Sequence, residues 1–121
     1  MKKNIHYIFI SLLIVLCVSC SKYDQKLSIT DIQKPQVITL HKKVNQRGIY
    51  AMGIRGSGDL NGNAQITLML NDQPYKTEQL NGKISFTWGG DWYSDSIEVR
   101  YQPGKVESGK LYIEYAFYDL K

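Results

Sequence analysis

The amino-acid sequence predicts an all-β protein, an antiparallel β-sandwich of about 7–8 short strands that follows a cleaved N-terminal signal peptide. Two observations predict this class. Apolar and polar residues alternate along most of the chain, and turn-forming residues recur about every 8–12 residues. No segment after the leader has the apolar spacing of an amphipathic helix. The pattern does not distinguish immunoglobulin-like from jelly-roll-like connectivity, and a barrel is a third possibility.

The N-terminal segment is typical of a secretory leader. Lys2 and Lys3 precede the uncharged run YIFISLLIVLCV, which extends from Tyr7 to Val18. A basic start followed by a short apolar stretch is the pattern of a signal peptide. The run is shorter than the roughly 20 apolar residues that a membrane-spanning helix needs, so cleavage is favoured over retention as an anchor.

Val18-Ser19-Cys20 ends the apolar run, and polar residues begin directly after the cysteine. This arrangement resembles the lipobox of bacterial lipoproteins, although Cys17 stands where that motif usually has Leu. The resemblance implies that Cys20 receives a diacylglyceryl thioether, that signal peptidase II cuts before it, and that the new amine is acylated. Sulfur is required because the thiol is the nucleophile that takes the lipid. Two or more acyl chains give a stable anchor.

The same resemblance implies a location and a domain organisation. The protein is expected in the envelope of a Gram-negative bacterium, lipid-anchored to the outer membrane, on a face that the sequence does not identify. Cleavage would discard Cys17 and acylation would cap Cys20, which leaves no cysteine pair for a disulfide or a metal. The expected parts are a signal peptide at 1–19, a lipidated cysteine and tether at 20–27, and a single β-sandwich domain at 28–121.

The net charge and the length of the chain limit the kinds of partner and the number of domains. The chain has a net charge of +4. Loss of Lys2 and Lys3 with the leader halves this excess, and a balance so close to neutral argues against a nucleic-acid partner. The roughly 100 residues that remain are enough for one domain with one core.

Strands are expected wherever apolar side chains occupy alternate positions, because successive residues of a strand face opposite sides of a sheet. The expected segments are residues 28–32, 36–41, 48–55, 65–70, 83–88, 96–101 and 110–118. The inward faces of the four clearest segments are expected to be Ile66, Leu68 and Leu70; Ile84, Phe86 and Trp88; Ile97, Val99 and Tyr101; and Leu111, Ile113, Tyr115 and Phe117.

Turn-forming residues separate these segments. Asn81-Gly82 predicts a tight type I′ hairpin, because both residues accept positive φ. Residues 59–63 are expected to reverse the chain. Residues 71–74 and 103–104 supply further turn chemistry.

The stretch from Trp88 to Tyr93 is the main candidate binding site. Trp88, Trp92 and Tyr93 flank two glycines, with Asp91 among them. Aromatic rings beside a carboxylate can hold a sugar, because the ring stacks on C–H groups and the acid accepts hydroxyl hydrogens. Such clusters also recognise protein partners. The simpler interpretation is that Trp88 is a core residue, and that Trp92 and Tyr93 cover one end of the sandwich.

Two other features admit a ligand but are explained as well without one. Tyr112 and Tyr118 share the polar face of the last strand, where they either decorate the sheet or form a ligand-binding face. Oxygen-bearing side chains occupy alternate positions of Asp59-Leu60-Asn61-Gly62-Asn63, a spacing that could serve Ca²⁺. An EF-hand loop requires Gly at its sixth position and Glu at its twelfth, where Ala64 and Leu70 stand. We therefore expect a plain turn and no metal site.

Catalytic chemistry has little support in the sequence. His41 is the only histidine after the leader, and no G-x-S-x-G nucleophile motif is present. Asp91, Asp95 and Glu98 could supply a carboxylate pair for glycoside hydrolysis, but acids in turns and on outer strand faces are usually only solvated. We therefore expect a protein that is not an enzyme and has no cofactor.

The expected function is that of a lipid-anchored, non-catalytic binding or accessory module. Its expected partners are the membrane, through the N-terminal lipid, and either a glycan or an envelope protein. The alternative is a structural or assembly subunit that docks onto a larger outer-membrane complex through a sheet edge or an aromatic face.

Overall fold

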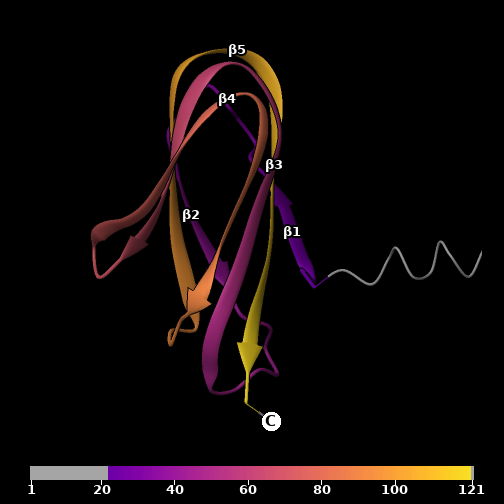
Figure 1. Ribbon diagram of the computed structural model, residues 1–121, viewed down its shortest axis with the longest axis vertical. Coiled ribbons are helices and arrows are strands. Elements are labelled where there is room, and N and C mark those ends of the chain that lie inside the picture. The colour runs from indigo at the N-terminus through magenta and orange to yellow at the C-terminus, as the bar shows by residue number, and fades with distance from the viewer. Residues whose placement is uncertain (1–21, 121) are drawn as a thin grey trace, which may run out of the picture.

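The computed structural model describes residues 22–120 and shows five antiparallel strands (Figure 1). They are β1 (Gln25–Ser28), β2 (Gln36–His41), β3 (Ile49–Leu70), β4 (Gln73–Asp91) and β5 (Ser96–Asp119). The predicted all-β class is confirmed. The leader and Cys20 lie outside the described residues. No helix within residues 22–120 is long and apolar enough to cross a membrane.

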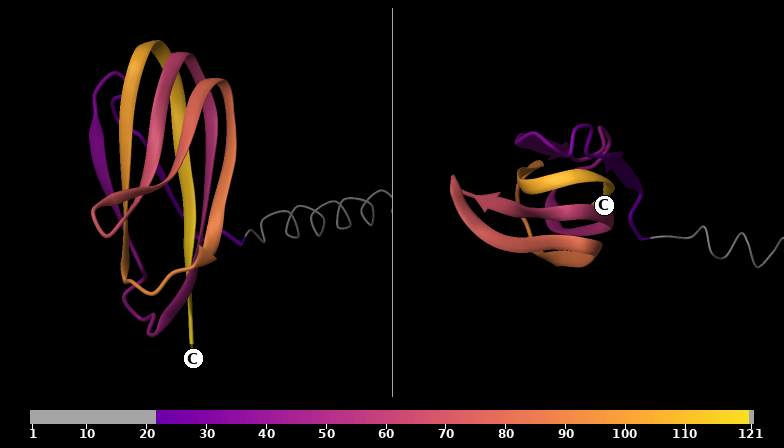
Figure 2. Two further views of the ribbon diagram at one scale, coloured as in Figure 1. Left: turned by 60° about the vertical axis from the view of Figure 1, so that its left-hand side comes forward. Right: turned by 90° about the horizontal axis from the view of Figure 1, so that it is seen from above.

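The strand count differs from the prediction because the three long strands bend. β3, β4 and β5 each arch over one end of the molecule and continue in a second layer (Figures 1 and 2). Each arch therefore turns one continuous strand into two segments, so the five strands supply eight segments to the sandwich.

The order of these segments defines the connectivity. The first layer has the order 25–28, 110–119, 49–60, 82–91. The second layer has the order 36–41, 96–106, 63–70, 73–81. Numbered along the chain, the segments read 1-8-3-6 in the first layer and 2-7-4-5 in the second. This is the order of a jelly roll, one of the two connectivities that the sequence left open.

Glycine allows the arches of β3 and β5 to lie against each other. Gly58 has φ 140° and Gly109 has φ 137°, in a region that other residues rarely adopt. A Cβ on Gly58 would overlap the carbonyl oxygen of Lys110, and a Cβ on Gly109 would overlap that of Asp59. The two backbones can therefore approach closely only without side chains at these positions.

The prediction of a hairpin at Asn81-Gly82 is wrong. β4 passes through both residues and stays paired with β3 on either side of them. A type I′ turn needs positive φ at both central residues, and here only Gly82 has it. The turn that does reverse the chain is Asn71-Asp72, where φ is 52° and 62°. The expected turn residues 59–63 and 103–104 likewise lie within bent strands, where the chain passes from one layer to the other.

The N-terminal boundary also differs from the expected one. β1 begins at Gln25, and Tyr23 is buried, so residues assigned to the tether are part of the fold. The strand expected at residues 28–32 ends at Ser28. The chain then turns, and the Asp31 carboxylate accepts a hydrogen bond from the Gln33 N–H.

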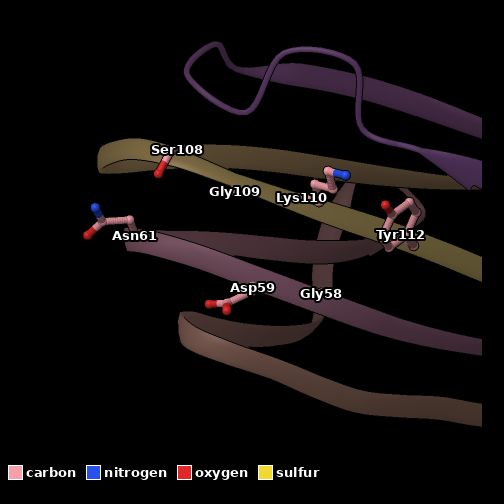
Figure 3. A pocket seen from close by; sticks show the side chains of 7 residues that line it. All are labelled: Gly58, Asp59, Asn61, Ser108, Gly109, Lys110 and Tyr112. Carbon is pink, nitrogen blue, oxygen red and sulfur yellow. The ribbon is translucent and has the colours of Figure 1, made fainter.

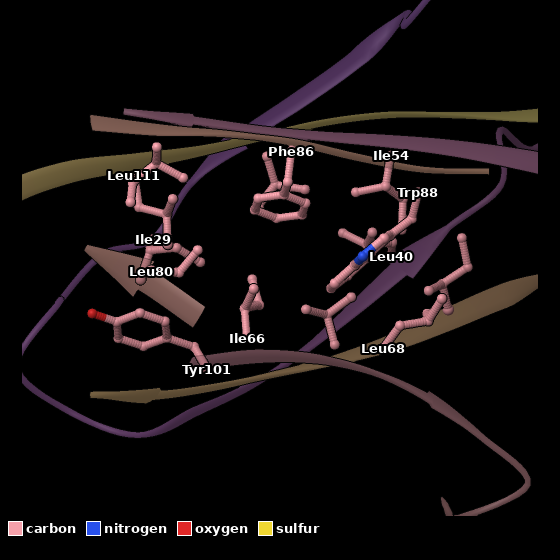
Figure 4. Packing of buried hydrophobic residues seen from close by; sticks show 14 of the residues in the cluster. Ile29, Leu40, Ile54, Ile66, Leu68, Leu80, Phe86, Trp88, Tyr101 and Leu111 are labelled. Atoms are coloured by element: carbon pink, nitrogen blue, oxygen red, sulfur yellow. The ribbon is translucent and has the colours of Figure 1, made fainter. Parts of the chain in front are cut away.

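The core fills the space between the two layers. Figure 4 shows Ile54 and Phe86 from the first layer facing Ile66 and Tyr101 from the second. The predicted inward faces of the four clearest segments are confirmed, with Tyr115 only partly buried. The exception is Leu70, which is 39% exposed because it lies at the end of β3, beside the hairpin turn.

Candidate functional site

The two tryptophans of the predicted binding stretch belong to the core. Trp88 and Trp92 are each 6% exposed. The Trp88 ring packs against Phe86, with 4.8 Å between ring centroids. The Trp92 indole N–H donates a hydrogen bond to the Ser96 carbonyl oxygen at 3.0 Å. Neither indole therefore offers a free face on which a sugar could stack.

The other two residues of that stretch point to solvent. Asp91 ends β4 and is exposed, and Tyr93 is 76% exposed in the turn that follows. Alternation explains the separation, because positions 88 and 92 share the inward parity whereas 91 and 93 have the opposite one. The structure thus divides Trp88, Asp91, Trp92 and Tyr93 into a buried pair and an exposed pair. The simpler interpretation expected Trp88 in the core, but it grouped Trp92 with Tyr93 as a cover for one end of the sandwich.

A different part of the surface is hollowed and is lined mainly by residues with polar side chains. A depression of about 360 Å³ lies on the outer face of the first layer, where β3 and β5 enter their arches (Figure 3). Its lining residues are Gly58, Asp59, Asn61, Ser108, Gly109, Lys110 and Tyr112. The glycines at the arches help to form the hollow, because they place no side chain over the backbone.

Tyr112 contributes the aromatic surface of this depression. It is half-buried on the outer face of β5. The residues opposite it in register are Ser28 of β1 and Ser57 of β3. Both are small, so neither of the two residues directly opposite covers the ring. The Lys26 ammonium lies 4.9 Å from the ring centroid, a cation–π contact at the edge of the site.

Charged groups of both signs line the same depression. Asp59 pairs in register with Lys110 on one side and with Lys83 on the other. Asn61 adds an amide, whose nitrogen lies 3.4 Å from a carboxylate oxygen of Glu107. The depression thus presents a carboxylate acceptor, an ammonium donor and an amide that can do both. This combination suits a neutral ligand that is rich in hydroxyl groups.

The three oxygen-bearing residues of the 59–63 stretch do not converge. The Asn63 amide oxygen accepts the Lys105 N–H at 3.3 Å, whereas Asp59 lines the depression. Among residues 22–120 no group of three or more His, Cys, Asp or Glu side chains could hold a metal ion. The Ca²⁺ possibility therefore gains no support from the described part of the chain.

The N-terminal segment is fixed to the same outer face. The Tyr23 ring, 8% exposed, lies over Gly53. The Arg55 guanidinium lies 4.9 Å from the centroid of that ring. Arg55 also donates two hydrogen bonds to one Glu114 carboxylate oxygen, at 2.7 and 2.9 Å. These contacts hold Tyr23, which lies close in sequence to the expected lipidation site, against the sheet.

Only part of this site was predictable from the sequence. Alternation predicted Tyr112 on a face that could bind a ligand, whereas the spacing of Asp59 and Asn61 indicated only a turn or a Ca²⁺ loop. The sequence gives no sign that Asp59 lies opposite Lys110, because that pairing follows from the register of β3 and β5. Glycines near both residues, Gly58 and Gly109, were the one local signal of a close approach between strands.

No protein-family model matches the chain, and no curated protein matches it. Among solved structures, the chain is similar to PirA, with 8% identity and a TM-score of 0.44 over 81% of this chain and 95% of that one. It is similar to the carbohydrate-binding module CBM36, solved with calcium and xylotriose, with 10% identity and a TM-score of 0.37 over 75% and 78%. It is also similar to CBM4, with 15% identity and a TM-score of 0.38 over 81% and 76%. At these values the similarities identify neither a family nor a ligand for this chain.

Proposed function

We propose that this protein is a lipid-anchored, non-catalytic glycan-binding module of a bacterial envelope, and that the glycan binds in the depression beside Tyr112. The observation that carries the proposal is a tyrosine ring with only serine directly opposite it on both neighbouring strands, in a hollow that also contains a carboxylate, an amide and an ammonium group. The anchoring part rests on the leader and on Cys20, as argued from the sequence.

The chemistry of the depression matches that of a sugar. A pyranose has an apolar face of C–H groups and a rim of hydroxyls that both donate and accept hydrogen bonds. Tyr112 can contact the apolar face, while Asp59 accepts and Lys110 donates hydrogen bonds at the rim. The volume of about 360 Å³ lies at the lower end of the range for small-molecule sites, which suits one or two sugar rings at the surface.

Retention on a glycan array tests the binding. The full chain, isolated from its native host in mild detergent, is expected to bind at least one glycan. Tyr112→Ala is expected to weaken that binding by at least about tenfold, because it removes the stacking surface. Asp59→Asn should also weaken it, since the amide accepts hydrogen bonds less strongly than the carboxylate.

Tyr93→Ala is the matched control. It removes a second exposed tyrosine, one that belongs to the stretch that the sequence had suggested. Binding is expected to survive this change. A wild-type chain that binds no glycan would overturn the proposal, and loss of binding in Tyr93→Ala but not in Tyr112→Ala would place the site elsewhere.

A further inference from the structure

β4 is an edge strand of both layers, and the opposite edges are β1 in the first layer and β2 in the second. β4 is last in the strand order, and within residues 22–120 its partner is β3 alone. An edge strand presents unpaired N–H and C=O groups that can pair with another chain. Natural proteins protect such edges with proline, charged side chains, especially lysine, and bulges.

The two halves of β4 differ in this protection. Residues 73–81, in the second layer, carry Pro74, Lys76 and Glu78. Their pairing with β3 also shifts register between Leu68 and Met69. Residues 84–90, in the first layer, contain neither proline nor a charged side chain, and their outward side chains are short ones, with Gly89 adding none. The first-layer half of the edge is therefore open to strand addition.

We propose that residues 83–91 of β4 pair antiparallel with the same residues of a second copy of this chain, about a two-fold axis at Thr87. This interface goes beyond the proposed glycan binding and does not depend on it. The occupant is a second copy because the charges of the edge are self-complementary. Lys83 and Asp91 are the charged residues of this stretch, and each stands four positions from Thr87.

In this register each Lys83 faces Asp91 of the second copy, so the interface has two opposite-charge pairs. Ser85 faces Gly89, and Thr87 faces Thr87. On the inner face, Phe86 lies opposite Trp88, an aromatic cross-strand pair. Two first layers would then form one continuous sheet across the axis.

The position of the N-terminal segment fits this symmetry. A two-fold axis perpendicular to a sheet leaves the outer faces of both copies on the same side. Tyr23 packs on the outer face of the first layer, over Gly53. The N-terminal segments of both copies therefore leave from one side of the continuous sheet, as attachment of both to a single membrane requires.

Disulfide trapping tests the register. In the full chain, isolated in mild detergent and mildly oxidised, Thr87→Cys is expected to give a covalent dimer. Residues directly opposite in an antiparallel pair have Cα atoms about 4.5–5.5 Å apart, within the range that a disulfide spans. The chain without an added cysteine measures the background.

Ser85→Cys is the control for position. The proposed register separates its two copies by four residues, about 13 Å along the strand, so no dimer is expected. Ser85→Cys combined with Gly89→Cys should restore the dimer, and a Cβ at Gly89 meets no contact closer than 3.5 Å. Dimers from Ser85→Cys alone, or Thr87→Cys bonded to another envelope protein and not to itself, would overturn the proposal.

Exchanging the charges at positions 83 and 91 gives a second test, made in the chain without an added cysteine. Lys83→Glu places like charges opposite each other at two points, and it is expected to weaken dimerisation by about tenfold or more. Lys83→Glu with Asp91→Lys restores both opposite-charge pairs and should restore the dimer. Analytical sedimentation in detergent measures the dimer fraction of the single and of the double variant. A wild-type chain that remains monomeric, or a double variant as weak as the single one, would contradict the interface.

Discussion

Tyr101 shows how one polar atom is accommodated in the core. Its side chain is 1% exposed, and its hydroxyl donates a hydrogen bond to the Ile32 carbonyl oxygen at 2.6 Å. The contact fastens the turn between β1 and β2 to the second layer. Burial raises the pKa of this phenol above its ordinary value of 10.0, and the nearby Asp31 carboxylate raises it further.

The raised pKa of Tyr101 predicts a loss of stability at alkaline pH. The folded state holds the phenol proton more tightly than the unfolded chain does, so the contribution of this group to stability is constant below about pH 10 and falls as pH rises above it. Tyr101→Phe should cost about 1 kcal/mol at neutral pH through the lost hydrogen bond, and should make the alkaline decline shallower. Denaturant titrations between neutral and alkaline pH measure both effects. Tyr93→Phe, at an exposed position, should change neither.

Trp92 is expected to act through stability and not through ligand contact. Trp92→Phe keeps an aromatic ring in the core but loses the hydrogen bond to Ser96, at a cost of about 1–3 kcal/mol. For any glycan that the wild type binds, the folded variant should have the same affinity. Titration below the unfolding transition separates the two effects, and a weaker affinity in the folded variant would mean that Trp92 contacts the ligand.

At the scale of the elements, the arches depend on glycine at particular places. Gly58→Ala should destabilise the protein by more than about 3 kcal/mol, because φ near 140° is essentially restricted to glycine and the new Cβ would overlap the Lys110 carbonyl. Gly82→Ala is the matched control. It also has positive φ, but its Cβ would meet nothing within 4 Å, so only about 1–2 kcal/mol is expected. Equal costs in thermal or urea unfolding would show that close strand approach is unimportant.

Alternation along the chain predicted most of the strand faces but not the arches. The inward set Ile84, Phe86 and Trp88 follows from local parity, because a one-residue slip would expose all three. Asn81-Gly82 has the composition of a hairpin turn, yet the chain bends there and remains paired with β3. Whether such a pair bends or reverses a strand depends on the path of the strands paired with it. That path is determined by contacts between residues far apart in the sequence.

The candidate site illustrates the same limit. Parity alone would have placed Trp88 and Trp92 inward, since they share the alternation of the buried residues. Tyr112 was identifiable as an outward aromatic residue. Its association with Asp59 and Asn61 was not, because these side chains meet only through the pairing of β3 with β5.

At the scale of the whole molecule, Tyr23 fixes the start of the chain to the sandwich. Tyr23→Ala should remove about 1.5–3 kcal/mol of burial energy and loosen residues 22–24 from the sheet. Limited trypsin digestion is expected to cut after Lys22 or Lys26 sooner than in the wild type. Tyr75→Ala, at an exposed position, should leave the digestion pattern unchanged. Equal protection in both variants would mean that Tyr23 does not hold the segment.

The position of Tyr23 also limits how far the protein can act from a bilayer. Tyr23 lies only three positions after Cys20, and an extended chain spans at most about 3.6 Å per residue. With lipid on Cys20, as we propose, the sandwich would stay within roughly 10 Å of the headgroups and could not sweep through a wide volume. Any polymer that it captures would have to lie against the membrane, so the protein would sample molecules that reach the lipid surface and would miss those held further away.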